Sequence, residues 1–329
     1  MKRNDIRVRA VVPAAALAAA VAAAAALGAC SSAPKGTGEV YDTRNKAAEY
    51  AALADGFLAR GEYESAVSFY RESLDANSRV DNVEGVARAR ASLGRAYLAA
   101  GNREDAEREF AEALAYAGMA GSKVAAALAK AGLGELAFGR GEREAALALF
   151  GESLALAQGD EAATAVALHD AATAKAAMGR GPEALADLEK AAAINLKGKR
   201  WTELASNHYM RASILSRAGQ PEAALAEALG ALAADKSAEN GKGIAADLAA
   251  VAALSRRLGK REEAYAYWRR AFDTSIAANE AVVVRKSLVA LGELAGELGK
   301  EKEAARGKAL LARLDEAEGA AKAAPPAKP

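Results

Sequence analysis

Apolar side chains recur along this chain at helical spacing, and glycines divide them at an almost constant interval. The glycines are Gly61, Gly101, Gly141, Gly179, Gly219, Gly259 and Gly299, which follow one another by 40 residues, with one interval of 38. An alanine lies five residues after each glycine, and in four units an aromatic residue lies four residues further, at Tyr70, Phe110, Phe150 and Trp268. A fixed period of this length indicates a repeat array, in which each unit is predicted to contain two helices that meet at the glycine.

Each predicted helix has about 14 residues, which is too short to be stable in isolation, so the helices must pack on each other and on the next unit. We expect the turn glycine to adopt the left-handed conformation that ends a helix. Small residues such as Gly94 and Ala106 let helix backbones approach closely, and the aromatic residue fills the space beside them. The chain is 52% hydrophobic but only 5% aromatic. Alanine and leucine, both strong helix formers, therefore dominate, and the expected fold is all-α.

The second unit resembles the tetratricopeptide repeat (TPR), a helix–turn–helix motif. It matches the family pattern at Leu93, Gly94, Tyr97, Gly101, Ala106, Phe110 and Ala113. Arg90 replaces the usual tryptophan, Leu-Gly is lost in the fourth to sixth units, and the period exceeds the usual 34 residues. The resemblance covers residues 45–318. It implies a right-handed superhelical solenoid of about seven TPR-like helical hairpins, with the first helix of each hairpin on the concave face.

The N-terminal residues 1–29 have the layout of a targeting segment. A basic stretch, MKRNDIRVR, precedes an apolar stretch from Val11 to Ala26, and LGAC then ends at Cys30. This layout resembles a bacterial lipoprotein signal peptide, which implies cleavage before Cys30 and lipidation of its sulfur. A free thiol or an uncleaved membrane helix are the alternatives. Both are weaker, because alanine is only mildly apolar and Cys30 is the only cysteine.

The lipoprotein resemblance also bears on location and on the ends of the chain. We expect residues 30–44 to form a lipidated polar tether and residues 319–329 to form a disordered tail. The mature protein would be anchored in the cell envelope by its acyl chains without crossing the membrane. Ser31, which follows the cysteine, favours the outer membrane, facing the periplasm. Loss of residues 1–29 removes four basic residues and one acidic residue, which lowers the net charge from +1 to −2 and does not suggest a nucleic-acid partner.

The sequence carries no motif for catalysis or for a cofactor. Neither histidine, His169 nor His208, has a cysteine or a patterned carboxylate nearby that would complete a metal site. Phosphate-binding loops, nucleophile elbows and dinucleotide fingerprints do not occur. We therefore predict a protein that is not an enzyme and that needs neither cofactor nor metal.

The TPR resemblance implies that a protein or peptide ligand binds in the concave groove. Projection of the family's groove positions onto this chain gives Arg88, Arg95, Glu135, His169, Thr173, Tyr209, Ser213 and Arg256. Three functions remain open at this point. The chain could be a scaffold or adaptor that aids assembly or localisation of an envelope complex, a regulator of cell-wall enzymes, or an enzyme with an unrecognised site.

The fifth unit departs from the pattern because Ala228 stands at its aromatic position. The same unit carries Trp201, Tyr209 and Met210 on or before its first helix, in a chain that is otherwise poor in aromatic residues. These side chains either refill the core that Ala228 leaves small or form an apolar patch in the groove.

Overall fold

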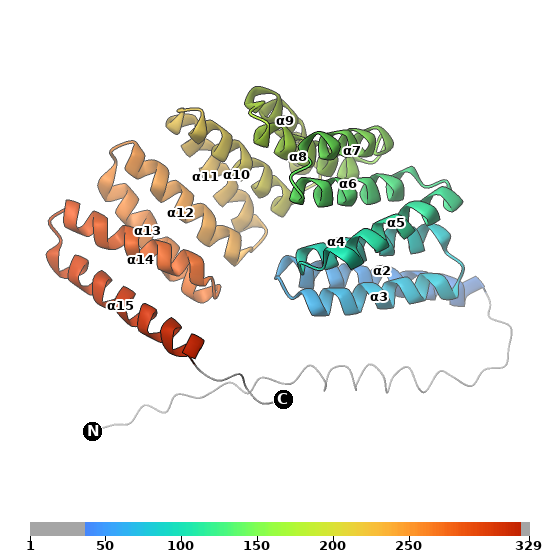
Figure 1. Ribbon diagram of the computed structural model, residues 1–329, viewed down its shortest axis with the longest axis horizontal. Helices are drawn as coiled ribbons and strands as arrows, with labels where there is room; N and C mark the ends of the chain where they lie inside the picture. The colour runs from blue at the N-terminus through green and yellow to red at the C-terminus, as the bar shows by residue number, and fades with distance from the viewer. Residues whose placement is uncertain (1–36, 324–329) are drawn as a thin grey trace, which may run out of the picture.

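A computed structural model describes residues 37–323, and this part of the chain is entirely helical, with fourteen helices and no strand. They form seven consecutive hairpins (Figure 1). The helices are α2 (Thr37–Ala59), α3 (Tyr63–Arg79), α4 (Val83–Ala99), α5 (Arg103–Ala120), α6 (Lys123–Gly139), α7 (Arg143–Leu156), α8 (Glu161–Ala177), α9 (Gly181–Lys197), α10 (Trp201–Arg217), α11 (Pro221–Ser237), α12 (Gly241–Arg257), α13 (Arg261–Ala277), α14 (Ala281–Glu297) and α15 (Glu301–Ala323). The all-α solenoid of about seven hairpins is thereby confirmed.

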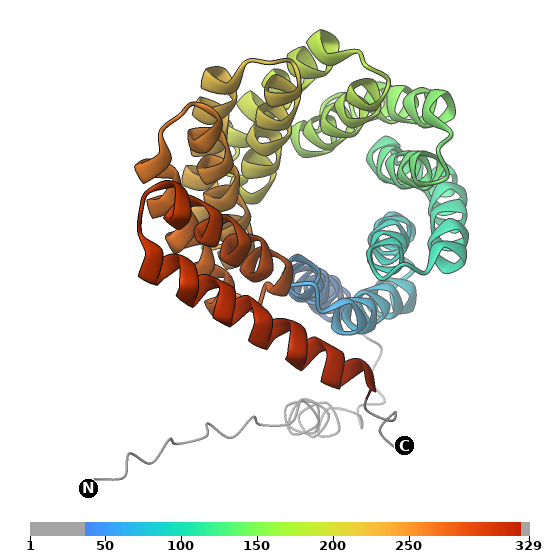
Figure 2. The ribbon, with the colours of Figure 1, turned by 60° about the vertical axis from the view of Figure 1, so that its left-hand side comes forward.

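The hairpins follow a strongly curved superhelical path (Figure 2). Each first helix contacts the first helix of the next hairpin, whereas successive second helices make no such contact within the described residues. The first helices α2, α4, α6, α8, α10, α12 and α14 therefore form the concave face. The path returns close to its start, because a Cβ built on Gly61, between α2 and α3, would lie 3.5 Å from Nζ of Lys242 on α12.

The repeated glycines end the first helices as the sequence predicts. All seven have a positive φ, between 69° for Gly299 and 84° for Gly141. This conformation is open to glycine at little cost and strained for residues with a Cβ. The period of about 40 residues therefore marks the turn inside each hairpin.

Small residues and aromatic rings pack against each other in the core, also as predicted. The ring of Phe110 is fully buried. A Cβ on Gly94 would lie 2.7 Å from Phe110 Cε1, and a Cβ on Gly132 would lie 2.1 Å from Phe110 Cζ. Glycine is thus required on both sides of the ring, because any side chain there would overlap with it.

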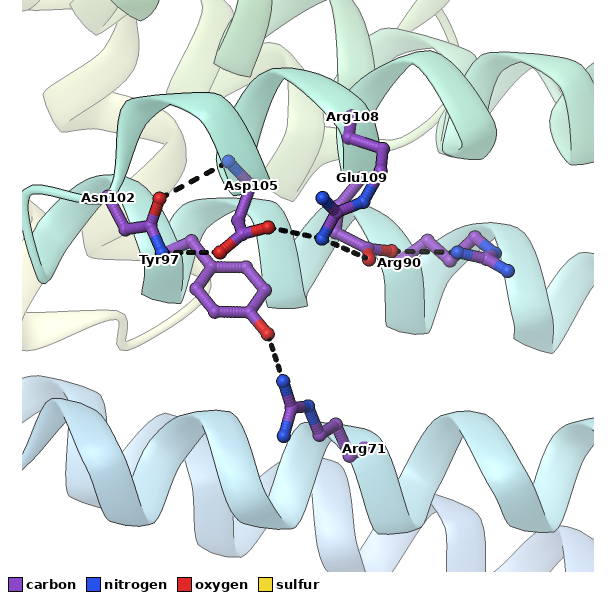
Figure 3. A network of polar contacts seen from close by, with 7 residues as sticks. All are labelled: Arg71, Arg90, Tyr97, Asn102, Asp105, Arg108 and Glu109. Carbon is purple, nitrogen blue, oxygen red and sulfur yellow. Dashed lines mark hydrogen bonds and ion pairs between the residues drawn. The ribbon is translucent and has the colours of Figure 1, made fainter.

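Arg90, which replaces the tryptophan of the family pattern, is tied into a polar network in the second hairpin (Figure 3). Its Nη1 donates to Glu109 Oε2 at 2.8 Å, and its guanidinium lies 5.2 Å from the ring centre of Tyr116. Arg71 on the preceding hairpin donates to the Tyr97 hydroxyl. Arg90 thus combines an ion pair with a contact to an aromatic ring, and both suit the planar guanidinium.

Both ends of the array differ from the expected boundaries. Helix α2 begins at Thr37, so residues 37–44 are helical and are not part of a tether. Glu39 lies in its first turn, where a carboxylate is favourable, and Val40 is half-buried against the end of α3. Helix α15 continues to Ala323 because its sequence remains rich in alanine up to the prolines that follow.

The proposed signal peptide, Cys30, residues 30–36 and the last six residues of the tail lie outside the described residues. Within residues 37–323, no helix combines the length and the apolar character that a membrane span requires.

Trp201 and Met210 do not belong to the cluster that surrounds Ala228, which consists of Ala212, Ala224, Leu225, Val251 and Leu254. Trp201 packs against a cluster that includes Leu204 and Ala234, and Met210 packs against a cluster that includes Leu188. Tyr209 is 47% exposed. Trp201 and Met210 are thus partly buried in neighbouring clusters rather than beside Ala228, and of the three only Tyr209 is exposed.

Candidate functional site

A cavity of about 680 Å³ lies in the concave face. Its walls come from the first helices α2, α4, α6, α8 and α10, from Asn195 on α9, and from the segments that precede α8 and α10. Leu128 and Val166 supply apolar surface. The charged side chains around it are Asp55, Arg88, Arg95, Asp160, Arg200 and Glu203. A groove of this size, with apolar walls and charged groups of both signs, suits a peptide segment better than a single small ion; we call it the concave groove.

The three arginines of the concave groove differ in the hydrogen bonds and ion pairs that they already make with the protein. Arg88 lies 3.8 Å from a carboxylate oxygen of Asp160, which caps α8. Arg200 donates from Nε to the Asn195 side chain at 2.9 Å and from Nη2 to a backbone carbonyl at 3.0 Å. Arg95 is exposed and makes no hydrogen bond or ion pair within the described residues. Its guanidinium is therefore free to bind a group from a partner.

Two carboxyl groups lie near Arg95 on the neighbouring first helices. Burial raises the pKa of Glu135 on α6 and raises the pKa of Asp170 on α8 well above its usual range. The charge of Glu135 raises the pKa of Asp170 further, and the charge of Arg95 opposes both shifts. The Oδ2 atom of Asp170 is shielded from solvent and has no hydrogen-bond partner. A buried carboxyl group without a partner is unusual, since such groups are costly to desolvate.

A chain of neutral hydrogen bonds runs beside Asp170. Asn195 Nδ2 donates to Asn207 Oδ1 at 2.8 Å, and Asn207 Nδ2 lies 2.9 Å from Nδ1 of His169. Because Asn207 is the donor here, His169 Nδ1 accepts and its proton is on Nε2. Burial lowers the pKa of His169, which favours the neutral imidazole.

These residues line a smaller pocket of about 100 Å³ that shares Val166, Asn195, Glu203 and Ser206 with the concave groove. The pocket also contains Asp170 and two apolar residues, Ala165 and Val166. We call it the Asp170 pocket.

Four of the residues expected from the sequence meet in this region. Arg88 and Arg95 line the concave groove, His169 lines the Asp170 pocket, and Glu135 lies within electrostatic reach of Arg95. The adjacent Thr173 donates its hydroxyl to the His169 carbonyl on its own helix, at 3.0 Å.

The other three expected residues lie outside both cavities. Tyr209 is exposed on α10, and Ser213, one turn further, accepts a hydrogen bond from Arg217 at 2.8 Å. Arg256 on α12 is held by two carboxylates of α14, Glu293 at 2.6 Å and Glu297. Its guanidinium links two hairpins and is not free for a partner.

The sequence prediction missed Asp170, Asn195, Arg200, Glu203 and Asn207. A signal for two of them exists in the repeat itself. The positions of Asn195 and Asn207 hold alanines, Ala117 and Ala129, at the junction of the second and third units. A polar residue at a position that holds a buried alanine at another junction therefore indicates that the packing differs there.

A metal site is not formed by the side chains of the described residues, because no group of three or more His, Cys, Asp or Glu is close enough together.

The comparisons with known proteins agree with this architecture. Two family models of the tetratricopeptide repeat match the chain, one at residues 46–117 and one at residues 164–197. No curated protein matches the sequence. The chain is thus a TPR-type helical solenoid whose repeats are recognisable by sequence in the first, second and fourth units.

Several solved structures share the fold at low identity. A signal transduction ATPase with numerous domains and a TPR sensor, from Pyrococcus horikoshii, is 14% identical with a TM-score of 0.62; the match covers 84% of this chain and 44% of that one. A Rap protein complexed with Competence and Sporulation Factor is 14% identical, with a TM-score of 0.56 and coverage of 82% and 76%. The apo form of RapI is 13% identical, with a TM-score of 0.63 and coverage of 80% and 75%.

The chain spans less than half the length of the first of these proteins. At such identities the likeness concerns the fold alone.

Proposed function

We propose that this protein is a binding scaffold that holds a protein or peptide segment in its concave groove. The observation that carries the proposal is the cavity of about 680 Å³ between the first helices, with the unpaired guanidinium of Arg95 at its wall. Grooves of this kind hold a segment through apolar contact and use a few charged groups to set its position. The Rap structure complexed with Competence and Sporulation Factor gives an example of a partner bound by a protein of similar fold.

The sequence supports a lipid anchor at Cys30 as part of the same proposal. A chain anchored in this way would present its groove to the periplasm from the outer membrane and would aid assembly or localisation of an envelope complex. The layout of residues 1–30 is the support for this part of the proposal.

Site-specific photocrosslinking in the native cells tests the binding proposal. A photoreactive phenylalanine analogue replaces Ser206, which is exposed and lines the cavity, and in a matched strain it replaces Glu112, which is exposed on the second helix α5. We expect discrete crosslinked species from position 206 and none from position 112. Equal crosslinking at both positions, or crosslinking at position 112 alone, would contradict a groove-bound partner.

A further inference from the structure

The Asp170 pocket contains a carboxyl group that the protein leaves unsatisfied. Within the described residues no hydrogen bond or ion pair reaches Asp170, although its Oδ2 atom is shielded from solvent. The neighbouring amides direct their hydrogen bonds elsewhere, since Asn195 donates to Asn207 and Asn207 donates to His169. A buried acceptor of this kind gains most from a ligand that brings several donors at once.

The shape and polarity of the pocket define what such a ligand would be. Its volume of about 100 Å³ admits only the end of a side chain, since one water occupies about 30 Å³ in the liquid. Ala165 and Val166 offer apolar surface for methylene groups, and Asp170 and Glu203 offer two carboxylates. An apolar wall that leads to carboxylates matches a lysine or arginine side chain, which has an apolar stem and a cationic tip.

We propose that the Asp170 pocket is a subsite for a basic side chain, lysine or arginine, of the segment bound in the concave groove. This inference rests on the proposed binding function and specifies the chemistry of the partner. The incoming cation places its donors on the carboxyl oxygens of Asp170. Arg95, which lines the concave groove but not this pocket, remains available for an acidic group of the same segment.

Proton release accompanies this binding. Burial and Glu135 on α6 raise the pKa of Asp170, while Arg95 on α4 opposes the shift; Glu203 on α10 and His169 on the same helix line the pocket beside it. Asp170 therefore keeps its proton to a higher pH than an ordinary aspartate. A lysine or arginine ligand favours the ionised carboxylate, so the affinity rises with pH as the free protein loses this proton.

Peptide selection on the full chain in detergent supplies the probes for a test. Random dodecapeptides displayed on phage are selected on the wild type, and enriched peptides are labelled and measured by fluorescence anisotropy. Three variants are compared: Asp170→Asn, which keeps the shape and removes the charge; Ser206→Trp, which fills the groove; and Glu112→Gln, a carboxylate-to-amide control on the outer helix α5. Circular dichroism of each variant checks folding.

We expect the enriched peptides to share a lysine or arginine. Replacement of that residue by norleucine should weaken binding to the wild type about 30-fold, the loss that follows when one partner of a buried charge pair is removed. The same replacement should have little effect on binding to Asp170→Asn. Affinity for the wild type should rise from pH 5.5 to 7.5, and affinity for Asp170→Asn should not.

The outcomes separate the two proposals. Peptides that Ser206→Trp excludes but that share no basic residue, or that lose the same affinity with norleucine on wild type and Asp170→Asn, would overturn the basic subsite alone. A selection that yields no peptide, or only peptides that bind Ser206→Trp as well as wild type, would overturn the groove as the binding site. Because norleucine changes the peptide and not the protein, its effect on binding to the wild type is measured whether or not Asp170→Asn folds, and an unchanged affinity there would also overturn the basic subsite.

Discussion

The stability of the array should fall as pH rises from acid to neutral, because two aspartates are buried together at one junction. Asp235 on α11 is 5% exposed and Asp247 on α12 is 2% exposed. Burial is the largest cause that raises the pKa of Asp247 to about 8, and the charge and hydrogen bond of Asp235 add to it. Burial raises the pKa of Asp235 as well, and the hydrogen bond that Asn240 donates to its Oδ1 at 2.9 Å opposes this shift. The pair therefore shares one proton, held by Asp247.

The sign of the effect follows from proton binding. Between the usual pKa of 3.8 and the raised value of about 8, the folded state keeps a proton on Asp247 that the unfolded state has lost. Stability from this group is fully present below pH 3.8 and is lost as pH rises through 8. Linkage gives a loss of about 1.4 kcal/mol in the free energy of unfolding per pH unit within this window.

Urea unfolding of the wild type and of Asp247→Asn, followed by circular dichroism from pH 5 to pH 8, measures the effect. The variant replaces the protonated acid by an amide that can still donate to Asp235, as Asn195 donates to Asn207 at the preceding junction. We expect the difference in stability between variant and wild type to grow in favour of the variant as pH rises. Asp273→Asn, at an exposed position on α13, serves as the matched control. Parallel pH curves for the wild type and Asp247→Asn would refute the shared proton.

Two further predictions concern the core and the anchor. Gly132→Ala should lower the free energy of unfolding by about 1–3 kcal/mol, because the new methyl group would overlap with the buried ring of Phe110. Gly151→Ala, on the open face of α7, should raise it by up to about 1 kcal/mol, because alanine is the better helix former. Thermal unfolding of both variants measures this contrast, and equal losses of stability would contradict it. Cys30→Ala should abolish incorporation of labelled palmitate and block cleavage of the signal peptide, so label in the variant would exclude lipidation at this cysteine.

Much of the fold could be predicted from sequence because the features that build it repeat. Gly141 and its six equivalents have positive φ, and the ring of Phe110 is fully buried between glycines. These constraints act within one hairpin or between neighbours, so the turn glycine recurs at the same offset in all seven units and the aromatic ring in four of them. The ends were harder to predict, since α2 starts at Thr37 and has 23 residues, whereas the next first helix, α4, has 17. The repeat pattern gives no sign of these additional N-terminal residues.

The groove could be predicted only in part, because its contacts join units that are distant in sequence. The register of the first helices places Arg88 and Arg95 on the concave face, and the structure has both in the cavity. The register does not show which arginine lacks an ion-pair partner. Arg256 pairs with Glu293 and Glu297, whereas Arg95 makes no ion pair within the described residues. Ion-pair partners depend on side-chain reach between hairpins, which helical periodicity does not encode.

The positions that the sequence prediction missed share a physical origin in the junction between hairpins. At the second and third junctions the equivalent positions are buried alanines, Ala117 with Ala129 and Ala157 with Ala167, which pack without polar groups. Later junctions replace them by Asn195 with Asn207 and by a pair of aspartates. Polar groups at such buried positions must satisfy each other, and the asparagine pair does so by extending its hydrogen bonds to His169 at the edge of the groove. The residues that shape the site thus differ from the repeat pattern. The pattern therefore predicts the fold but does not predict these residues.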